Sequence, residues 1–500
     1  MTGSRVIGGN SVSTAQQVRE SLEHPVIDAD GHLVEYLPLV KEFLREEAGS
    51  ELVRDFESST GLLPPEIPDS IQSRRHAGFY RGAWWGLPAE NSLDRATAAL
   101  PRLMYDRLDE LGIDLAFLYP TYGLSVLAMA QDDLRVAMAR AFNRYVAEVY
   151  GGFVDRLCPV AVIPMNSPDE ALAELDHAVE ELGLRAVMMA GLVNRSTQND
   201  EGDCRIQTFD SLGHDSVFDY DPVWTRCVEL GVSPAFHSFG YGWGSRRSTR
   251  NYMYNHVGNF AAAGEATARS LFFGGVPTRF PELNWAFQEG GVVWALNLLS
   301  DIVGHYGKRN EAGLRNYEPD RLDVQHVREL FDKYGEQSQI RHIGELEKFL
   351  NAVGIRDDEL CPTGDEFLES GIKSVEDIYE IFCSRYFFGC ESDDPLNVLA
   401  TRCSTLLDGA EMKSMFASDI GHWDVTDMRS VLPDAWDLVE EGLLVPEEFS
   451  AFVFGNVVDF YGRVNPEVFE GTSVEDQARS YLSTSGGSSP VAGDGEPKGP

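Results

Sequence analysis

Short apolar runs alternate with helix-like patterns along most of the chain, from about residue 25 to residue 475. Several runs follow a helical pattern that stops at a glycine, as happens at Gly112, Gly183 and Gly231. A helix, a glycine stop and an apolar strand, repeated along a chain, are typical of βα units. The runs predict eight strands, over Val26–Asp30, Ile113–Tyr119, Leu157–Ile163, Leu184–Met189, Val232–Phe236, Leu283–Gln288, Ser384–Gly389 and Met412–Ala417.

Eight βα units fit a (β/α)8 barrel, so we predict an α/β protein whose residues 25–475 form one barrel domain. A doubly wound sheet is the alternative, and it would carry a glycine-rich phosphate loop after an early strand. The turn that follows the first run, Asp30-Gly31-His32, contains no G-x-G-x-x-G pattern. The barrel is therefore the better prediction.

Four segments depart from the alternation. Residues 1–24 are polar and rich in Gly and Ser and predict a flexible arm, and residues 485–500 predict a disordered tail. Residues 50–102 predict a long irregular insertion between the first two strands, and residues 310–381 predict a helical, charged insertion between the sixth and seventh. Loops of this length usually form lids or oligomer contacts, so we expect a homodimer or higher oligomer, or a complex with a paralogous subunit.

Composition narrows the class of protein. Asp and Glu number 80 against 41 Lys and Arg, a formal charge of −39 that repels nucleic acid and anionic membranes. No apolar run reaches the length of a membrane span, and the first residues lack the apolar core of a signal peptide. The seven cysteines are scattered and form no C-x-x-C pair, which is typical of reduced thiols. We therefore expect a cytoplasmic enzyme that acts on a small molecule.

Side chains that bind metals follow five of the predicted strands. Asp30 and His32 are two residues apart, so they point the same way on an extended backbone. The ends of the fifth, sixth, seventh and eighth strands carry His237, Glu289, Glu391 and Asp419. In a parallel barrel the carboxyl ends of the strands meet at one face, where the active site lies. The sequence therefore predicts a metal site built from carboxylates and imidazoles.

Each of these residues also has a structural explanation when it is taken alone. A buried histidine at position 237, an acid favoured by a helix dipole at position 289 and a helix cap at position 419 are all ordinary features. The metal site is the better interpretation because so many strand ends carry such side chains together. The second to fourth strands end in residues that we interpret as substrate or wall positions, namely Tyr119, Thr121, Pro164, Asn166, Ala190 and Asn194.

These motifs resemble those of the amidohydrolase-related proteins, the second amidohydrolase group, which includes ACMS decarboxylase and aromatic acid decarboxylases. The resemblance covers roughly Val26 to Thr472. It rests on Asp28-Ala29-Asp30-Gly31-His32, on Arg107–Asp114 running into Leu118-Tyr119-Pro120-Thr121, on His237, on Glu289-Gly290-Gly291 and on Ala417-Ser418-Asp419 with His422. It implies a distorted (β/α)8 TIM barrel with one or two metal ions.

The chain departs from the family pattern at two positions. The usual opening is H-x-H and is here Asp30-x-His32, and the usual sixth-strand histidine is here Glu289. In the decarboxylase members one divalent ion, often Zn or Mn, binds the opening pair, the fifth-strand histidine and the eighth-strand aspartate. The resemblance therefore implies Asp30, His32, His237 and Asp419 as ligands. Glu289 is then an acid/base group or an extra ligand, and Asp419 also takes a proton from bound water.

Three functions remain open at this point. The first is metal-dependent hydrolysis or non-oxidative decarboxylation of a small, aromatic or carboxylated substrate. The second is hydroxylation with O2 at two Fe or Fe/Mn ions, with Glu289 and Glu391 as ligands of the second ion, because hard oxygen ligands suit these metals. The third is a non-catalytic subunit that pairs with an active one. The cofactor is Zn, Mn or Fe.

The sequence offers several residues for binding the substrate. Arg246, Arg247 and Arg250 follow His237 on one loop and suit a carboxylate, although they also fit a solvated basic patch. His256 and His422 are further polar candidates. The aromatic residues that fit a pocket wall are Trp84, Trp85, Tyr122, Phe239, Tyr241 and Trp243.

Overall fold

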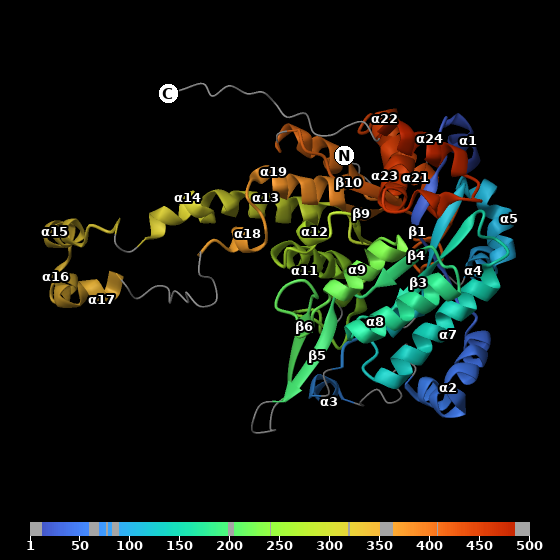
Figure 1. Ribbon diagram of the computed structural model, residues 1–500, viewed down its shortest axis with the longest axis horizontal. Coiled ribbons are helices and arrows are strands. Elements are labelled where there is room, and N and C mark those ends of the chain that lie inside the picture. The colour runs from blue at the N-terminus through green and yellow to red at the C-terminus, as the bar shows by residue number, and fades with distance from the viewer. Residues whose placement is uncertain are drawn as a thin grey trace, which may run out of the picture.

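Eight parallel strands form a nearly closed barrel in the computed structural model. Helices surround these strands, as Figure 1 shows. The structure describes residues 13–59, 70–76, 79–82, 90–198, 205–240, 242–318, 321–350, 364–407 and 409–485. The strands, in barrel order, are β1 (Ile27–Leu33), β2 (Leu115–Pro120), β3 (Leu157–Ile163), β4 (Ala186–Met189), β7 (Pro234–Phe236), β8 (Trp285–Phe287), β9 (Tyr386–Glu391) and β10 (Lys413–Ala417).

All eight apolar runs form strands of the barrel, so the predicted fold class is confirmed. The main difference is in β1, which continues to Leu33 and is buried along its whole length. The apolar pattern ends earlier because Asp28, Asp30 and His32 are polar residues inside a buried strand. Polar side chains in such a position serve a site rather than the core.

The barrel closes where the residues after β10 meet β1. The backbone N–H of Asp419 donates to the carbonyl of Asp30 (2.9 Å), and the N–H of His32 donates to the carbonyl of Ile420 (2.7 Å). The carboxylate of Asp28 strengthens the same seam, since it accepts from the Ser418 N–H (3.0 Å) and hydroxyl (2.5 Å). The first and last strands therefore lie side by side at the carboxyl end of the barrel.

Helices surround the strands and also occur in both insertions. Their bounds are α1 (Ala15–Ser21), α2 (Leu37–Ser59), α3 (Ile71–His76), α4 (Ser92–Ala99), α5 (Pro101–Leu111), α6 (Gly123–Val126), α7 (Asp132–Tyr150), α8 (Pro168–Leu175), α9 (Asp221–Leu230), α10 (Tyr252–His256), α11 (Asn259–Phe273), α12 (Val276–Arg279), α13 (Val293–Arg309), α14 (Glu311–Leu314), α15 (Val324–Tyr334), α16 (Gln337–Ile340), α17 (Leu346–Leu350), α18 (Glu366–Glu369), α19 (Val375–Glu380), α20 (Leu399–Arg402), α21 (Val431–Glu440), α22 (Pro446–Ser450), α23 (Asn456–Gly462) and α24 (Glu475–Ser485).

Both insertions contain helices among their described residues. The irregular structure predicted for residues 50–102 is wrong at α3 and α4 and at the end of α2, which the sequence pattern missed because these helices are short or kinked. Pro64, Pro65, Trp84 and Trp85 lie outside the described residues. In the second insertion, α15, α16 and α17 project away from the barrel as an arm (Figure 1).

A two-stranded hairpin follows β4 and was not predicted. It pairs β5 (Val193–Gln198) with β6 (Arg205–Asp210) in antiparallel register. Its sequence lacks the apolar alternation of a half-buried strand, and an ion pair between Arg195 and Asp210 (2.9 Å) holds its base. Asn194 is therefore part of this hairpin and not a wall residue at the end of β4.

The flexible arm predicted over residues 1–24 is wrong for its described part. Residues 15–21 form α1, where Thr14 and Gln17 make a capping box and Arg19 pairs with Asp114 (2.6 Å). Of the tail predicted from residue 485, the structure describes Ser485 alone, as the end of α24.

Two further features concern the cysteines and the length of the helices. Within the described ranges the cysteines carry free thiols, and Cys204 and Cys361 lie outside those ranges. Among the described helices, none is long and apolar enough to cross a membrane.

Gly31 sits in the irregularity of the β1–β2 register and leads to a test of the fold. A Cβ at this position would lie 2.6 Å from the Asp28 carboxylate that holds the seam. We expect Gly31→Ala to lower the free energy of unfolding by about 1–3 kcal/mol, measured by urea denaturation. Gly304→Ala on α13 is the control, because a Cβ there meets nothing within 4 Å and alanine favours a helix. A Gly31→Ala protein as stable as the wild type would contradict this account of the seam.

Candidate metal centre

Five of the predicted site residues converge at the carboxyl end of the barrel. β1 supplies Asp30 and His32, and His237, Glu289 and Asp419 directly follow β7, β8 and β10 or lie within two residues of them. The side chains of four of them are fully or almost fully buried, namely Asp30, His32, His237 and Asp419. The barrel closure explains the convergence, since it places the two ends of the domain next to each other.

The two imidazoles face each other across the centre, with acids around them. The Nε2 atoms of His32 and His237 are 3.4 Å apart. The Nε2 of His32 lies 3.2 Å from an oxygen of Asp419 and 3.6 Å from an oxygen of Asp30. The Nε2 of His237 lies 3.3 Å from an oxygen of Glu289 and 3.7 Å from the second oxygen of Asp30.

The unpaired atoms of these side chains fit a divalent cation. Both carboxylate oxygens of Asp30, one of Glu289 and one of Asp419 are buried without a hydrogen-bond partner. Buried polar atoms normally have partners, and a cation would satisfy several of these atoms at once. The possible ligand atoms fall into two groups that share His32: one adds Asp30 and His237, and the other adds Glu289, Asp419 and His422. Mixed imidazole and carboxylate ligands suit Zn, Mn or Fe.

The buried acids raise one another's pKa values. Burial raises the pKa of Asp30, Glu289 and Asp419 well above the usual range, and nearby carboxylates raise it further. For Glu289, the largest contribution after burial comes from Glu391, whose own pKa rises to about 7 for the same reasons. Such a cluster of acids holds protons unless a cation is present.

The imidazoles shift in the opposite direction. Burial lowers the pKa of His32 well below its usual range, and it lowers the pKa values of His237 and His422 to about 3. The neighbouring imidazoles lower the pKa of His32 further. All three side chains are therefore neutral near pH 7, which is the form in which histidine binds a metal.

Two of the acids have an unusual backbone conformation. Glu289 (φ 56°) and Asp419 (φ 54°) adopt left-handed conformations, as do only Leu212 and Asp215 among the other non-glycine residues that the structure describes. A non-glycine residue in this region costs on the order of 1–3 kcal/mol and is often found at a functional site. At Gly421, a Cβ would lie 2.5 Å from the His32 carbonyl, so only glycine lets the loop turn this close to β1.

His422 lies nearer the centre than its predicted role as a substrate contact implies. Its ring stacks on that of His32, with centroids 3.5 Å apart, and its Nδ1 lies 2.5 Å from the Asp419 carboxylate. It therefore belongs to one of the two groups of possible ligands, and its role as a substrate contact stays a prediction. The spacing of three residues from Asp419 is a signal that could have placed it there.

The structure also adds Asp424, which the sequence analysis missed. It lies on the loop after β10 and is exposed, and its charge raises the pKa values of Glu289, Glu391 and Asp419. Glu391 ends β9 and contributes to the same field, but it lies outside both groups of possible ligands in the described residues.

The predicted substrate residues lie on the loops around the centre. The guanidinium of Arg246 donates to the carbonyls of Val257 (3.3 Å) and Gly258 (2.8 Å), so it braces its own loop, while Arg250 is exposed. Trp243 is half-buried against Phe209 of the hairpin.

His256 lies at the same end of the barrel. Its Nδ1 is 3.0 Å from the Tyr252 hydroxyl, and its ring lies 5.4 Å from that of Trp423. Phe260 borders the centre, with its ring 5.3 Å from that of His237. Trp84, Trp85 and Tyr241 lie outside the described residues.

Known proteins are similar to parts of this chain. Residues 27–337 match the sequence profile of the amidohydrolase family. Gamma-resorcylate decarboxylase of Rhizobium radiobacter is 29% identical over 171 residues, which are 34% of this chain and 46% of that protein. The 2-amino-3-carboxymuconate-6-semialdehyde decarboxylase of Dictyostelium discoideum is 27% identical over 164 residues, which are 33% of this chain and 40% of that protein. The chain thus matches less than half the length of either relative.

The comparison with solved structures includes one with a TM-score above 0.5, which shares the fold. An amidohydrolase from Mycobacterium avium subsp. paratuberculosis K-10 is 18% identical, with a TM-score of 0.51 over 88% of this chain and 100% of that one. A complex of 5-carboxyvanillate decarboxylase from Novosphingobium aromaticivorans with manganese is 15% identical, with a TM-score of 0.49 over 88% of this chain and 96% of that one. The profile match extends over well over half of the 500 residues, and the chain belongs to the amidohydrolase family.

Proposed function

We propose that this protein is a divalent-metal-dependent decarboxylase of a small aromatic carboxylic acid. The observation that carries the proposal is the set of buried, unpaired carboxylate oxygens that faces two neutral imidazoles at the carboxyl end of the barrel. The similarity to two decarboxylases supports this reaction over hydrolysis. No feature of the described residues favours hydrolysis or a non-catalytic subunit.

Asp30, His32, His237 and Asp419 would hold the metal ion. When bound, the ion would supply a Lewis acid that binds and orients oxygen atoms of the substrate. The side chains themselves supply a rigid frame, because all four are buried and their backbones belong to, or adjoin, barrel strands. Aromatic neighbours such as Phe260 would line the site and exclude water from a planar ring.

Glu289 would supply the proton that decarboxylation needs. In this reaction the bond between the ring carbon and the carboxylate breaks, CO2 leaves, and the electron pair stays on the ring carbon. That carbon then takes one proton, which balances the reaction. A carboxyl oxygen of Glu289 lies at the centre without a hydrogen-bond partner, so it is placed to hold and transfer this proton.

A second candidate is an O2-dependent hydroxylase with two metal ions. One observation favours it: the possible ligand atoms form two overlapping groups, and the second contains Glu289, Asp419 and His422. Two ions would also offset more of the negative charge that these acids and Glu391 bring to the centre. The number of metal ions per chain separates the two candidates.

The first test of the metal centre uses His237. We expect His237→Ala to lower the affinity for Mn²⁺ by more than about tenfold. Even the loss of a residue that only hydrogen-bonds to a metal ligand lowers metal affinity by about tenfold or more. Equilibrium dialysis with elemental analysis measures the affinity. His305→Ala is the control, since His305 is an exposed histidine on α13. Equal affinities of His237→Ala and the wild type would exclude His237 as a ligand.

The second test uses Glu289. In a one-ion decarboxylase, Glu289→Gln keeps one bound ion but lowers kcat by about 10²–10⁴, because an amide cannot exchange the proton. In the two-ion candidate, the same change removes about one ion per chain, because an amide is a poor ligand. The control is Glu282→Gln, an exposed residue just before β8. Normal turnover and normal metal content in Glu289→Gln would remove Glu289 from both mechanisms.

We also propose that the chain forms a homodimer through the arm of helices α15, α16 and α17. Large apolar side chains of the arm are exposed to solvent, among them Leu330, Tyr334 and Phe349. Burying them against a second copy would remove apolar surface from water. Light scattering should therefore give about twice the chain mass of 55.5 kDa at micromolar concentration. A species of 55.5 kDa alone would refute the dimer.

A further inference from the structure

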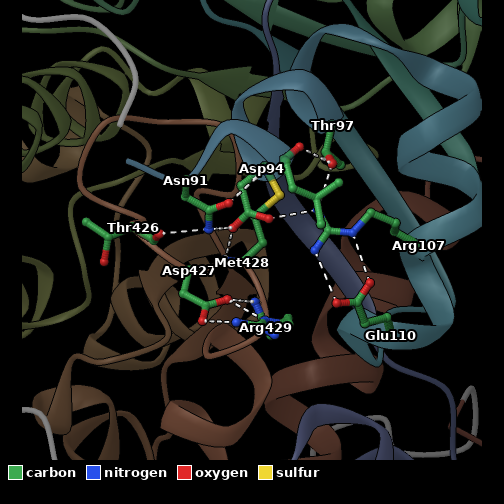
Figure 2. Close-up of polar contacts among 10 residues, drawn as sticks. Asn91, Asp94, Thr97, Arg107, Glu110, Thr426, Asp427, Met428 and Arg429 are labelled. Carbon is green, nitrogen blue, oxygen red and sulfur yellow. Dashed lines mark hydrogen bonds and ion pairs between the residues drawn. The ribbon is translucent and has the colours of Figure 1, made fainter. Parts of the chain in front are cut away.

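A buried ion pair lies next to the loop that follows β10 and is bonded to it. The Arg107 guanidinium donates to the Asp94 carboxylate (2.7 Å) and to the Thr97 hydroxyl (2.6 Å), as Figure 2 shows. Asp94 lies on α4 and Arg107 on α5, and their side chains are 5% and 6% exposed. Glu110 holds the other edge of the guanidinium, with 3.0 Å between its carboxylate and the Arg107 Nε.

The Asp94 oxygen that does not contact Arg107 binds the loop after β10. The second carboxylate oxygen of Asp94 accepts from the backbone N–H of Met428 (2.8 Å). The same oxygen accepts from the Asn91 amide (2.7 Å), which also donates to the carbonyl of Thr426 (3.2 Å). Asn91 and Asp94 thus hold residues 426–428 through two backbone groups (Figure 2).

α4 also contacts the end of the first strand. The carbonyl of Ala98 accepts from the N–H of Val34 (2.8 Å), two residues beyond His32. One helix of eight residues therefore joins the exit of β1, which carries Asp30 and His32, to the loop after β10. The strand exits that supply most of the metal-binding side chains are connected through α4 as well as across the seam.

Hydrogen bonds fix the loop 419–428 at both of its ends, and residues of the site lie between these two points. At its start, Asp419 and Ile420 bond to the backbone of β1. At its far end, Met428 bonds to Asp94. Residues 422–424 lie between these points. A loop that is fixed at both ends has little freedom to move its side chains, whereas a loop released at one end has much more.

We propose that Asp94 and Arg107 are positioning residues, which fix the loop 419–428 and so place Asp419 and His422 at the metal centre. This role rests on the proposed metal-dependent function. A buried ion pair adds little to stability compared with apolar residues of the same volume, because both charges lose their hydration. A role in placing the loop explains why a buried pair stands at this position.

The test compares two buried acids: Asp94, which binds the loop after β10, and Asp459, which binds the first residue of β10. Asp459 is 3% exposed and pairs with Lys413 (3.3 Å), the first residue of β10, and with Arg463 (2.7 Å). Removing it also breaks the ion pairs of a buried carboxylate, although Lys413 and Arg463 are 31% and 41% exposed, and it does so at the start of β10 rather than at the loop that follows it. We would measure two quantities in Asp94→Ala and Asp459→Ala: the hydrogen exchange of backbone amides in residues 420–428, and the Kd for Mn²⁺.

In Asp94→Ala, exchange in the loop should rise by about tenfold or more, and the Kd for Mn²⁺ should rise by about tenfold. Asp459→Ala should lose stability and keep both the slow loop exchange and the wild-type Kd. Asp94→Asn should be intermediate in both, since an amide keeps one acceptor oxygen. If Asp94→Ala does not fold, Asp94→Asn and Asn91→Ala carry the test, because Asn91→Ala removes the bond to Thr426 and leaves the ion pair.

Loop exchange and metal affinity that are unchanged in the Asp94 variants, or that change equally in Asp459→Ala, would overturn the positioning role. A wild-type protein that binds no Mn²⁺ would refute the proposed function instead. The exchange comparison needs no metal and would still decide whether Asp94 fixes the loop.

Discussion

The closure of the barrel between β1 and β10 is the constraint on which the site depends. Asp28 and Ser418 are 390 residues apart in the chain, and their side chains share a buried hydrogen bond at the seam. Two backbone hydrogen bonds beside it join Asp30 to Asp419 and His32 to Ile420. A metal centre assembled from both ends of the domain exists only while this seam is closed, so folding of the barrel and assembly of the site are one event.

The site is costly for the folded protein. Several acids and imidazoles are buried close together, and two of the acids have left-handed backbone conformations. Burying unpaired charge destabilises a fold strongly unless the groups hold protons or bind a cation. A divalent ion would therefore stabilise the native state as well as create the reactive centre, since a ligand that binds only the folded chain shifts the folding equilibrium. Outside the barrel, α4 and α5 help to hold the loop that carries Asp419 and His422.

The sequence predicted the barrel well, because the alternation of apolar strands and glycine-ended helices reports directly on βα units. It also identified Asp30, His32, His237, Glu289 and Asp419 as neighbours, because parallel strands bring their carboxyl ends together. The hairpin β5–β6 and the short helix α4 escaped prediction, since polar strands and short helices are stabilised by contacts with distant residues rather than by their own pattern. The same limit applies to His422 and Asp424. Their place at the centre depends on the path of an irregular loop, which hydrogen bonds to other elements determine.

We propose above all that Asp30, His32, His237 and Asp419 bind a divalent ion at the carboxyl end of the barrel. The most direct measurement is a crystal structure of the manganese-loaded protein, with the ion located by its anomalous scattering. The account predicts an anomalous peak bonded to Asp30, His32, His237 and Asp419, at roughly 2.0–2.3 Å from each ligand atom. No peak at this end of the barrel, or a peak that these four side chains do not bind, would contradict it.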